Sequence, residues 1–432
     1  MTKWLDTRER DFEERFRALL AEKRETAADV NEAVAAIIAR VRNEGDAALI
    51  DLTAKFDGLD LAKTGIAITP AEIDAARAAV DAETLAALEL AHARILDHHQ
   101  RQMPKDDSYT DKTGVELGQR WTPVASAGLY VPGGTASYPS SVLMNAVPAK
   151  VAGVKRLVMV VPAPKGELNP LVLVAAALAG VDEVYRVGGA QAVAALAYGT
   201  KTIPPVAKIV GPGNAYVAAA KRQVYGQVGI DMVAGPSEVV VIADKDNDPA
   251  WIASDLLAQA EHDIAAQSIL ITDDADFAKA VAAAVDAQLA TLPRADTARA
   301  SWDEFGAVIL VKSLDEAPAI ADRLAPEHLE IATADPDALA AKVHDAGAIF
   351  VGRYTPEVIG DYVAGTNHVL PTARSARFAS GLGVLDFMKR TSLLKLEADS
   401  LKALGPAAMA LARAEGLEAH RRSVAIRLNL PD

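Results

Sequence analysis

The sequence contains no cysteine, few aromatic residues and no long apolar run. Without cysteine, the protein has neither disulfides nor thiolate metal ligands nor a cysteine nucleophile. The apolar stretch at residues 171–181 falls short of the roughly 18 to 20 residues that a transmembrane helix needs. Residues 1–16 carry charges of both signs and no apolar core, unlike a secretory signal. We therefore expect a cytoplasmic protein whose chemistry uses side chains other than cysteine.

Charge and length narrow the class of protein further. The formal net charge is −14 at pH 7, which opposes non-specific binding to nucleic acid because such binding needs Lys and Arg to neutralise phosphates. The 432 residues exceed what one hydrophobic core usually supports. Hydrophobic residues make up 51% and charged residues 24%, as is typical of globular enzymes. We expect a multidomain enzyme with neither a nucleic-acid nor a membrane partner.

The hydrophobic pattern changes along the chain. Residues 6–56 and 70–101 show helical periodicity, whereas from residue 127 onward short apolar runs alternate with glycine turns and helical stretches. One series of strands contains GLYVP, RLVMVVP, EVYRVGG and AKIVGPGN, and a second contains EVVVIAD, SILIT, AVILV, LEIAT and AIFVG. The connections are long enough for crossover helices, so both series predict parallel sheets.

The pattern therefore predicts an α/β fold with two doubly wound, incomplete Rossmann-like domains, a helical N-terminal segment and a helical C-terminal tail. A single TIM barrel is the alternative, but the helical N-terminus and the break at residues 234–236 favour two sheets. The polar stretch 361–382 is too long for a simple turn and predicts a functional loop. The expected parts are the segment 1–28, a first domain of 29–127 with 238–381, a second of 128–237, and the tail 382–432.

Three glycine-rich turns follow strands of the first series, at Pro132-Gly133-Gly134, Gly188-Gly189-Ala190-Gln191 and Gly211-Pro212-Gly213-Asn214. Such turns let a phosphate approach the backbone at the positive end of the next helix. None matches the GxGxxG fingerprint, and an ordinary tight turn is the alternative for each one. Because all three lie at the same end of one predicted sheet, they favour a ligand crevice.

Gln259 and His262 lie three residues apart in a helical pattern and therefore share a face. This spacing suits a metal, but two donors do not complete the shell of roughly four ligands that zinc prefers. A structural or surface role stays open. Asp361, at the start of the polar loop, and His420, near the C-terminus, are the distant residues that can complete such a shell.

Glu327 and His328 follow Pro326 at the start of the LEIAT run. A carboxylate and an imidazole at one site can divide water activation and proton abstraction between them. Neighbouring residues of a strand point to opposite faces, so only a turn geometry lets both reach one substrate. A solvated corner is the alternative.

The other histidines are assigned from their surroundings in the sequence. His368 lies in the polar loop and is either a loop-ordering or a substrate-proximal residue. The charged helical pattern around His92, His98 and His99 predicts a solvated face for these three side chains.

Seven strings, in one order along the chain, resemble histidinol dehydrogenase: GLYVPGG, GPGNAYVAAAK, DMVAGPSE, DLLAQAEHD, APEHLE, GDYVAGTNHVLPT and EGLEAH. The similarity runs from about residue 30 to the end of the chain, and the ordered set is far more specific than any single string. One departure is the run ARSARF after NHVLPT, where many members of the family carry Gly-rich residues. It affects the conformation of the loop and no assigned position.

The resemblance implies a role for each of eleven residues. The zinc ligands would be Gln259, His262, Asp361 and His420. The general base would be His328, and the acid that activates water would be Glu327. The contacts to NAD would be Tyr130, Gln191 and Asn214. The substrate contacts would be Ser237 and Glu415, together with His328 and the four metal ligands.

The resemblance also implies the reaction: a zinc-dependent, NAD-linked oxidation of L-histidinol to L-histidine through L-histidinaldehyde, the last steps of histidine biosynthesis. The domain at 128–237 would bind NAD, and the other would bind zinc and substrate. The C-terminal tail would complete the site of a partner subunit in a homodimer. Relatives that act on sulfonated diols are expected to lack the Glu/His pair of EGLEAH. A metal-dependent hydrolase with Glu327 as base and a non-catalytic nucleotide-binding module are the alternatives.

Overall fold

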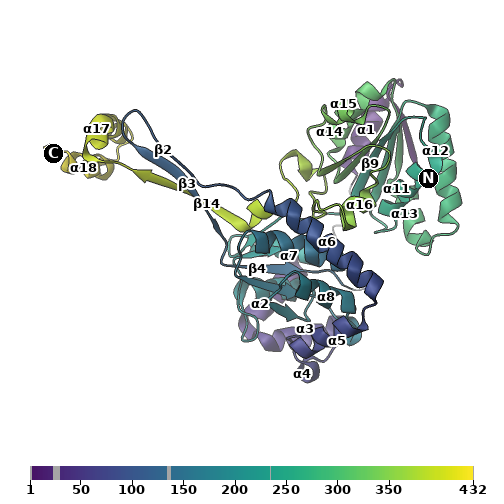
Figure 1. Cartoon of the computed structure of the whole chain (residues 1–432), viewed down its shortest axis with the longest axis horizontal. Helices are drawn as coiled ribbons and strands as arrows, with labels where there is room; N and C mark the ends of the chain where they lie inside the picture. The colour runs from purple at the N-terminus through teal and green to yellow at the C-terminus, as the bar shows by residue number, and fades with distance from the viewer. Residues whose placement is uncertain (1, 23–29, 134–137, 234, 432) are drawn as a thin grey trace.

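The computed structural model describes residues 2–22, 30–133, 138–233 and 235–431. They form two lobes, each built on one parallel sheet, and an arm that projects away from both lobes (Figure 1). Among the described residues, no helix is long and apolar enough to cross a membrane. The predicted α/β class with two parallel sheets is confirmed, and the barrel alternative is wrong.

The five-stranded lobe has the strand order β6-β5-β4-β7-β8, and all its pairs are parallel. Its strands are β4 (Ser126–Tyr130), β5 (Arg156–Val160), β6 (Glu183–Tyr185), β7 (Lys208–Val210) and β8 (Gly229–Ile230). The crossover helices are α7 (Pro139–Val151), α8 (Pro170–Leu178), α9 (Gly189–Tyr198) and α10 (Ala215–Val224), with a short η1 (Pro164–Gly166). The chain starts in the middle, winds to one edge and then reverses between β4 and β7, as in a Rossmann-like fold.

The six-stranded lobe repeats this order and adds the N-terminal strand at one edge: β1-β11-β10-β9-β12-β13. Its strands are β1 (Lys3–Asp6), β9 (Glu238–Ala243), β10 (Gln267–Thr272), β11 (Ala307–Leu310), β12 (His328–Ala332) and β13 (Ala348–Val351). Its helices are α1 (Phe12–Ala21), α11 (Pro249–Ala260), α12 (Ala275–Leu289), α13 (Ala295–Phe305), α14 (Ala317–Leu324), α15 (Pro336–Ala340) and α16 (Glu357–Tyr362), with η2 (Leu314–Glu316) and η3 (Ser375–Arg377). In this sheet the reversal lies between β9 and β12.

The early helices pack on a different sheet from the one expected. They are α2 (Val30–Glu44), α3 (Asp46–Asp57), α4 (Leu61–Thr64), α5 (Pro70–Ala79) and α6 (Ala82–Gln100). Val34 shares a core with Val158 of β5, and Ile95 shares one with several residues of the same lobe. The packing therefore differs from the expected grouping of 29–127 with 238–381. Helical periodicity defines an apolar face but not the sheet that this face covers.

The N-terminal segment belongs to the six-stranded lobe. Strand β1 pairs with β11, and Leu5, Phe12 and Phe16 join the apolar core beneath this sheet. The sequence pattern indicated only a helix here, because a four-residue strand within a charged segment leaves no periodic signal.

The arm consists of the antiparallel sheet β14-β3-β2 and two terminal helices (Figure 1). Its elements are β2 (Asp107–Thr110), β3 (Glu116–Pro123), β14 (Met388–Lys395), α17 (Ala398–Ala414) and α18 (Glu418–Arg427), and η4 (Val384–Phe387) precedes β14. The tail is thus helical at its end, as predicted, but the strand β14 precedes its two terminal helices. Leu394, Leu411 and Ile426 are each at least 66% exposed, so this arm presents apolar side chains to solvent.

Candidate functional site

The glycine-rich turns meet at the carboxyl edge of the five-stranded sheet. Gly211 directly follows β7, and Gly133 follows β4 by three residues, so both lie where the strand order reverses. Sheets of this type bind ligands in the crevice outside this edge. A cavity of about 380 Å³ opens beside Gly133 and Asn169. Gly134 lies outside the described residues.

Tyr130 and Gln191 are held together through Gly189. The Tyr130 hydroxyl accepts a hydrogen bond of 3.0 Å from the backbone N–H of Gly189, and burial raises the pKa of Tyr130 to about 12. The buried Gln191 side chain folds back on the same glycine, since a Cβ at Gly189 would lie 2.8 Å from Gln191 Oε1. The structure therefore brings two of the three residues expected to contact NAD to one turn.

The third residue, Asn214, caps helix α10. Its Oδ1 accepts hydrogen bonds from the backbone N–H groups of Tyr216 and Val217, at 3.1 and 3.2 Å. Asn214 is exposed at the same turn as Gly211. Gly211 has a φ of +110°, and a Cβ there would lie 2.1 Å from the Tyr130 carbonyl oxygen. Only glycine fits at this contact, which ties the turn before α10 to the strand that carries Tyr130.

A second group of predicted residues meets at the amino edge of the six-stranded sheet. His328 is the first residue of β12 and pairs with Val239 of β9, and Ser237 directly precedes β9. Gln259 and His262 lie at the end of α11, which leads into β10. Helix ends and strand starts coincide at this edge because the connections are short.

Glu327 and His328 both turn toward the backbone of Glu238. Glu327 Oε2 accepts a hydrogen bond of 3.1 Å from the Glu238 N–H, and His328 Nδ1 lies 3.1 Å from the Glu238 carbonyl oxygen. The two side chains approach to 3.9 Å. This is the turn geometry that two neighbouring residues need to act at one place, so the solvated-corner alternative is wrong.

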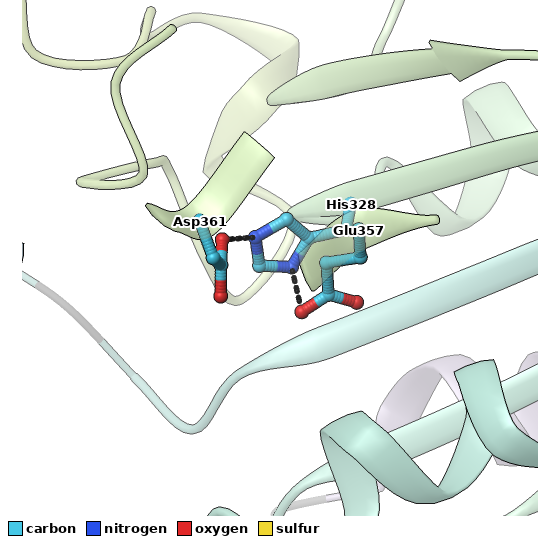
Figure 2. Close-up of side chains that lie close together, drawn as sticks. All are labelled: His328, Glu357 and Asp361. Atoms are coloured by element: carbon cyan, nitrogen blue, oxygen red, sulfur yellow. Dashed lines mark ion pairs between the residues drawn. The ribbon is translucent and has the colours of Figure 1, made fainter. Parts of the chain in front are cut away.

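The His328 imidazole lies between two carboxylates of α16 (Figure 2). Its Nδ1 is 3.5 Å from Glu357 Oε1, and its Nε2 is 3.6 Å from Asp361 Oδ1. Burial by itself disfavours the charged ring, but the nearby carboxylates of Glu357, Glu327 and Asp361 outweigh it and raise the pKa of His328 to about 10. An imidazole surrounded in this way holds a proton strongly.

Gly360 allows α16 to come this close. A Cβ at Gly360 would lie 2.4 Å from the ring of Phe350 on β13, and the Phe350 ring also packs against His328. The backbone N–H of Glu357 donates a 2.6 Å hydrogen bond to Glu330 Oε1 on β12. These contacts press the helix onto the sheet, and they place Asp361 opposite His328.

Sequence reasoning missed a line of carboxyls behind His328, of which Glu330 and Glu357 are buried and Asp255 is half-buried. Burial raises the pKa of Glu357 to about 8 and that of Asp255 to about 6, and it holds the pKa of Glu330 well above its usual range. Two signals were available in the sequence: Glu330 interrupts an otherwise apolar strand, and Asp255 precedes Gln259 by one helical turn.

The buried polar atoms of this edge suit a cation. Gln259 is fully buried, its Nε2 lies 3.2 Å from His262 Nδ1, and its Oε1 has no hydrogen-bond partner among the described residues. The Gln259 amide, with its unsatisfied oxygen, lies beside the His262 imidazole, and the Asp361 carboxylate acts electrostatically on the same imidazole. An amide oxygen, an imidazole and a carboxylate together are a donor set for a divalent metal. His328, Glu357 and Asp361 also offer ligand atoms within 4.8 Å of one another, and the two sets share Asp361.

A cavity of about 390 Å³ lies farther along the amino edge, lined in part by Pro236, Glu238 and Arg374. None of the predicted catalytic, metal or substrate residues is among the described residues that line it. This cavity therefore does not mark the site.

Glu415 and His420 lie elsewhere in the chain. Both are exposed on the arm, at and beyond the end of α17, and Figure 1 shows the terminal helices at the opposite end of the molecule from the six-stranded lobe. Within one chain, the structure does not bring His420 to Gln259, His262 and Asp361.

The polar loop after α16 links the two lobes. His368 Nδ1 lies 3.0 Å from the Asp361 carbonyl oxygen, and its Nε2 lies 3.2 Å from Ser141 Oγ on α7. These contacts favour the loop-ordering interpretation of His368. His99 is fully buried and lies 3.3 Å from the Asn367 amide, so the prediction of a solvated face is wrong for this residue.

The ARSARF departure has a backbone consequence. Ala373 and Arg374 adopt φ values of +51° and +62°, in the left-handed region that favours glycine. The Ala373 N–H donates a 3.2 Å hydrogen bond to Glu238 Oε1, which helps to hold this conformation. The loop thus keeps a glycine-like backbone with other side chains.

Fold and site together define a two-lobed α/β enzyme with an imidazole and carboxylate cluster at one sheet edge and glycine-rich turns at another. The family model for histidinol dehydrogenase matches residues 20–428. The chain belongs to the histidinol dehydrogenase family and is an oxidoreductase that acts on a CH–OH group.

Relatives and solved structures agree over almost the whole chain. A histidinol dehydrogenase of Rhizobium meliloti (strain 1021) is 70% identical over 427 residues, which cover 99% of this chain and 98% of the relative. One of Agrobacterium fabrum (strain C58 / ATCC 33970) is 67% identical, with 99% of each chain covered. The crystal structure of histidinol dehydrogenase from Elizabethkingia anophelis matches with a TM-score of 0.94 and 36% identity, covering 99% of this chain and 98% of that one.

Proposed function

We propose that this protein oxidises L-histidinol to L-histidine through L-histidinaldehyde, in two NAD-linked hydride transfers at a zinc site, as the last steps of histidine biosynthesis. The observation that carries the proposal is the placement of His328. Its ring is buried at a sheet edge, its Nδ1 faces the Glu238 carbonyl, and its Nε2 faces Asp361.

His328 acts as the general base. A neutral imidazole that donates its Nδ1 proton to the Glu238 carbonyl keeps Nε2 as the acceptor. Nε2 can take the proton of the substrate hydroxyl as hydride passes from the carbinol carbon to NAD. In the isolated cluster the carboxylates hold a proton on this ring. Neutralising the Asp361 carboxylate removes one of those interactions and favours the neutral base.

Glu327 serves the second oxidation. Without cysteine, the covalent route through a thiohemiacetal is closed, so the aldehyde must be hydrated before it can lose a second hydride. Glu327 is only 6% exposed and is oriented by the Glu238 N–H. Its carboxylate can activate water beside His328.

The zinc ligands are Gln259, His262, Asp361 and, from the partner subunit, His420. When bound, the metal would supply a positive charge that attracts the nitrogen donors of histidinol and orients the substrate. The unsatisfied Gln259 oxygen supports this assignment. The substrate is also contacted by Ser237 of the same subunit as His328 and by Glu415 of the partner subunit.

NAD binds at the carboxyl edge of the five-stranded sheet, at Tyr130, Gln191 and Asn214. The support comes from the glycine turns at the reversal between β4 and β7 and from the Tyr130 hydroxyl bound to Gly189. A cytoplasmic location, suggested by the composition, stays a prediction.

The decisive test of the reaction is a count of NADH at 340 nm against added histidinol. The proposal requires two NADH per histidinol and loss of the signal on chelation, with recovery when zinc is restored. Zinc-dependent turnover without NADH would contradict it in favour of a hydrolase. NAD binding that survives chelation without turnover would favour a non-catalytic module.

The homodimer is tested separately. Because the arm lies far from the six-stranded lobe of its own chain (Figure 1), His420 can complete a site only in another subunit. In a dimer with exchanged tails, a subunit with His328→Asn and a partner with His420→Asn form one intact and one doubly defective site. The purified mixed dimer should regain roughly half of the wild-type turnover, although each parent homodimer has lost most of its activity. A mixed dimer as inactive as its parents would overturn the exchange of tails.

A further inference from the structure

A buried ion pair lies directly beneath the turn at Gly211. Lys221 on α10 and Asp231 after β8 form the pair, with side chains only 2% and 1% exposed. Neither Lys221 nor Asp231 has a role in the proposed reaction. Burying two charges costs solvation free energy that their attraction often fails to recover, so such a pair is weak evidence for a role in stability alone.

Both members of the pair bind the peptide groups of one residue. Lys221 Nζ donates a 2.9 Å hydrogen bond to the Gly211 carbonyl oxygen, and the Gly211 N–H donates one of 2.8 Å to Asp231 Oδ2. Strand β7 ends at Val210, so the two side chains hydrogen-bond the first peptide groups beyond the regular strand pairing.

A displacement of Gly211 would spread to both neighbouring turns. Its Cα lies so close to the Tyr130 carbonyl that no Cβ fits, and it begins the turn that leads to Asn214 and α10. Tyr130 in turn binds the N–H of Gly189 through its hydroxyl. A shift of Gly211 would therefore move the cofactor-binding residues of two turns at once.

We infer that Lys221 and Asp231 are positioning residues for the nicotinamide cofactor, because their ion pair holds the Gly211 peptide in the orientation that the cofactor turn requires. The inference rests on the proposed binding of NAD at this edge. The pair touches the backbone of the turn and not the cofactor, so its effect is on the affinity for NAD and not on the chemistry at His328.

The test uses the zinc-loaded enzyme and two double variants that leave no unpaired buried charge. Lys221→Met with Asp231→Asn keeps an acceptor for the Gly211 N–H, whereas Lys221→Met with Asp231→Leu removes it. Lys150→Met is the matched control, because Lys150 pairs with Asp182 at 2.9 Å and Asp182 binds the Leu157 N–H at the opposite edge of the same sheet. The readouts are Kd and KM for NAD, KM for histidinol, kcat and Tm.

We expect Kd and KM for NAD to rise at least tenfold in the Leu double variant and by less in the Asn double variant. KM for histidinol and kcat at saturating NAD should stay within about twofold of wild type, and the control should bind NAD normally. A lower Tm with unchanged affinity for NAD, or equal losses for NAD and histidinol, would overturn the inference while the proposed function stands. Failure of the wild-type enzyme to bind NAD would overturn both.

Discussion

The two parallel sheets share one strand order but carry their functional residues at opposite edges. The five-stranded sheet gathers glycine turns at its carboxyl edge, where helices α9 and α10 begin. The six-stranded sheet gathers carboxylates and imidazoles at its amino edge, where helices α11 and α14 end. The same topology thus presents two kinds of candidate site, one built from backbone groups and one from side chains.

Helix polarity gives a physical reason for the difference. The start of a helix carries partial positive charge and unpaired N–H groups, which favour an anion such as a pyrophosphate. The end of a helix carries partial negative charge, which favours a cation. A negatively charged cofactor and a divalent metal therefore suit opposite edges of a doubly wound sheet.

The largest expected effect is at the six-stranded edge. His328→Asn should lower kcat by roughly 10²- to 10⁴-fold, the usual contribution of a general base, because Asn cannot take the substrate proton. Zinc content and the affinity for NAD should not change, since this ring is not among the proposed ligands of zinc or contacts to NAD. Steady-state kinetics with metal analysis checks the result. His344→Asn, at a side chain that is 78% exposed, is the control, and near-normal turnover of His328→Asn would remove the residue from this role.

The second-largest expected effect is at the carboxyl edge of the five-stranded sheet and distinguishes NAD binding there from zinc binding at the six-stranded sheet. Gly211→Ala should destabilise the protein by roughly 2–4 kcal/mol and weaken NAD binding, because the added methyl group meets the Tyr130 carbonyl and φ is positive. Zinc should still bind. Gly226→Ala is the matched control, since Gly226 has a φ of +100° and open space around it. Thermal unfolding and NAD titration measure both, and equal losses in the two variants would contradict the close contact.

The smallest effect concerns the buried carboxyls behind His328. Asp255 has a folded-state pKa raised by burial from 3.8 to about 6, so its contribution to stability is fully present below about pH 4 and is lost as pH rises through about 6. As pH rises from 4.5 to 7.5 in chelated protein, the free energy of unfolding of Asp255→Asn should therefore increase by about 1–2 kcal/mol relative to that of wild type. Denaturant unfolding at several pH values measures this gain. Glu304→Gln, at an exposed carboxyl, should show no such change, and a parallel response of wild type and Asp255→Asn would contradict the burial.

The early helices and the arm show what the local sequence pattern does not determine, namely which sheet a helix covers and which strands pair. Most of residues 30–56 and 70–100 is helical, as predicted, yet only the shared core of Val34 and Val158 shows to which lobe the first of these helices belongs. Strand β1 has only four residues, and the strands of the arm are exposed or half-buried along their whole length, so none of them shows the period that reveals a strand. Their pairing comes from distant segments.

The residues of the candidate site likewise fall into those that the sequence predicted and those that only tertiary contacts reveal. The pairs Glu327–His328 and Gln259–His262 were found from spacing, because neighbours in sequence stay neighbours in the fold. Glu357 was missed, since its place beside His328 depends on the contact of Gly360 with Phe350. The position of His420 on a projecting arm likewise follows from the sheet that carries it.

By itself, the sequence determined the α/β class, the two parallel sheets, the glycine turns and the chemistry available without cysteine, because these follow from composition and from periods of a few residues. Only the tertiary structure decided which helices cover which sheet, which carboxyls are buried against His328, and how far the C-terminal arm lies from Gln259 and Asp361. Those outcomes depend on packing between segments that are distant in the chain, from a few tens to hundreds of residues apart, and local periodicity carries no record of such contacts.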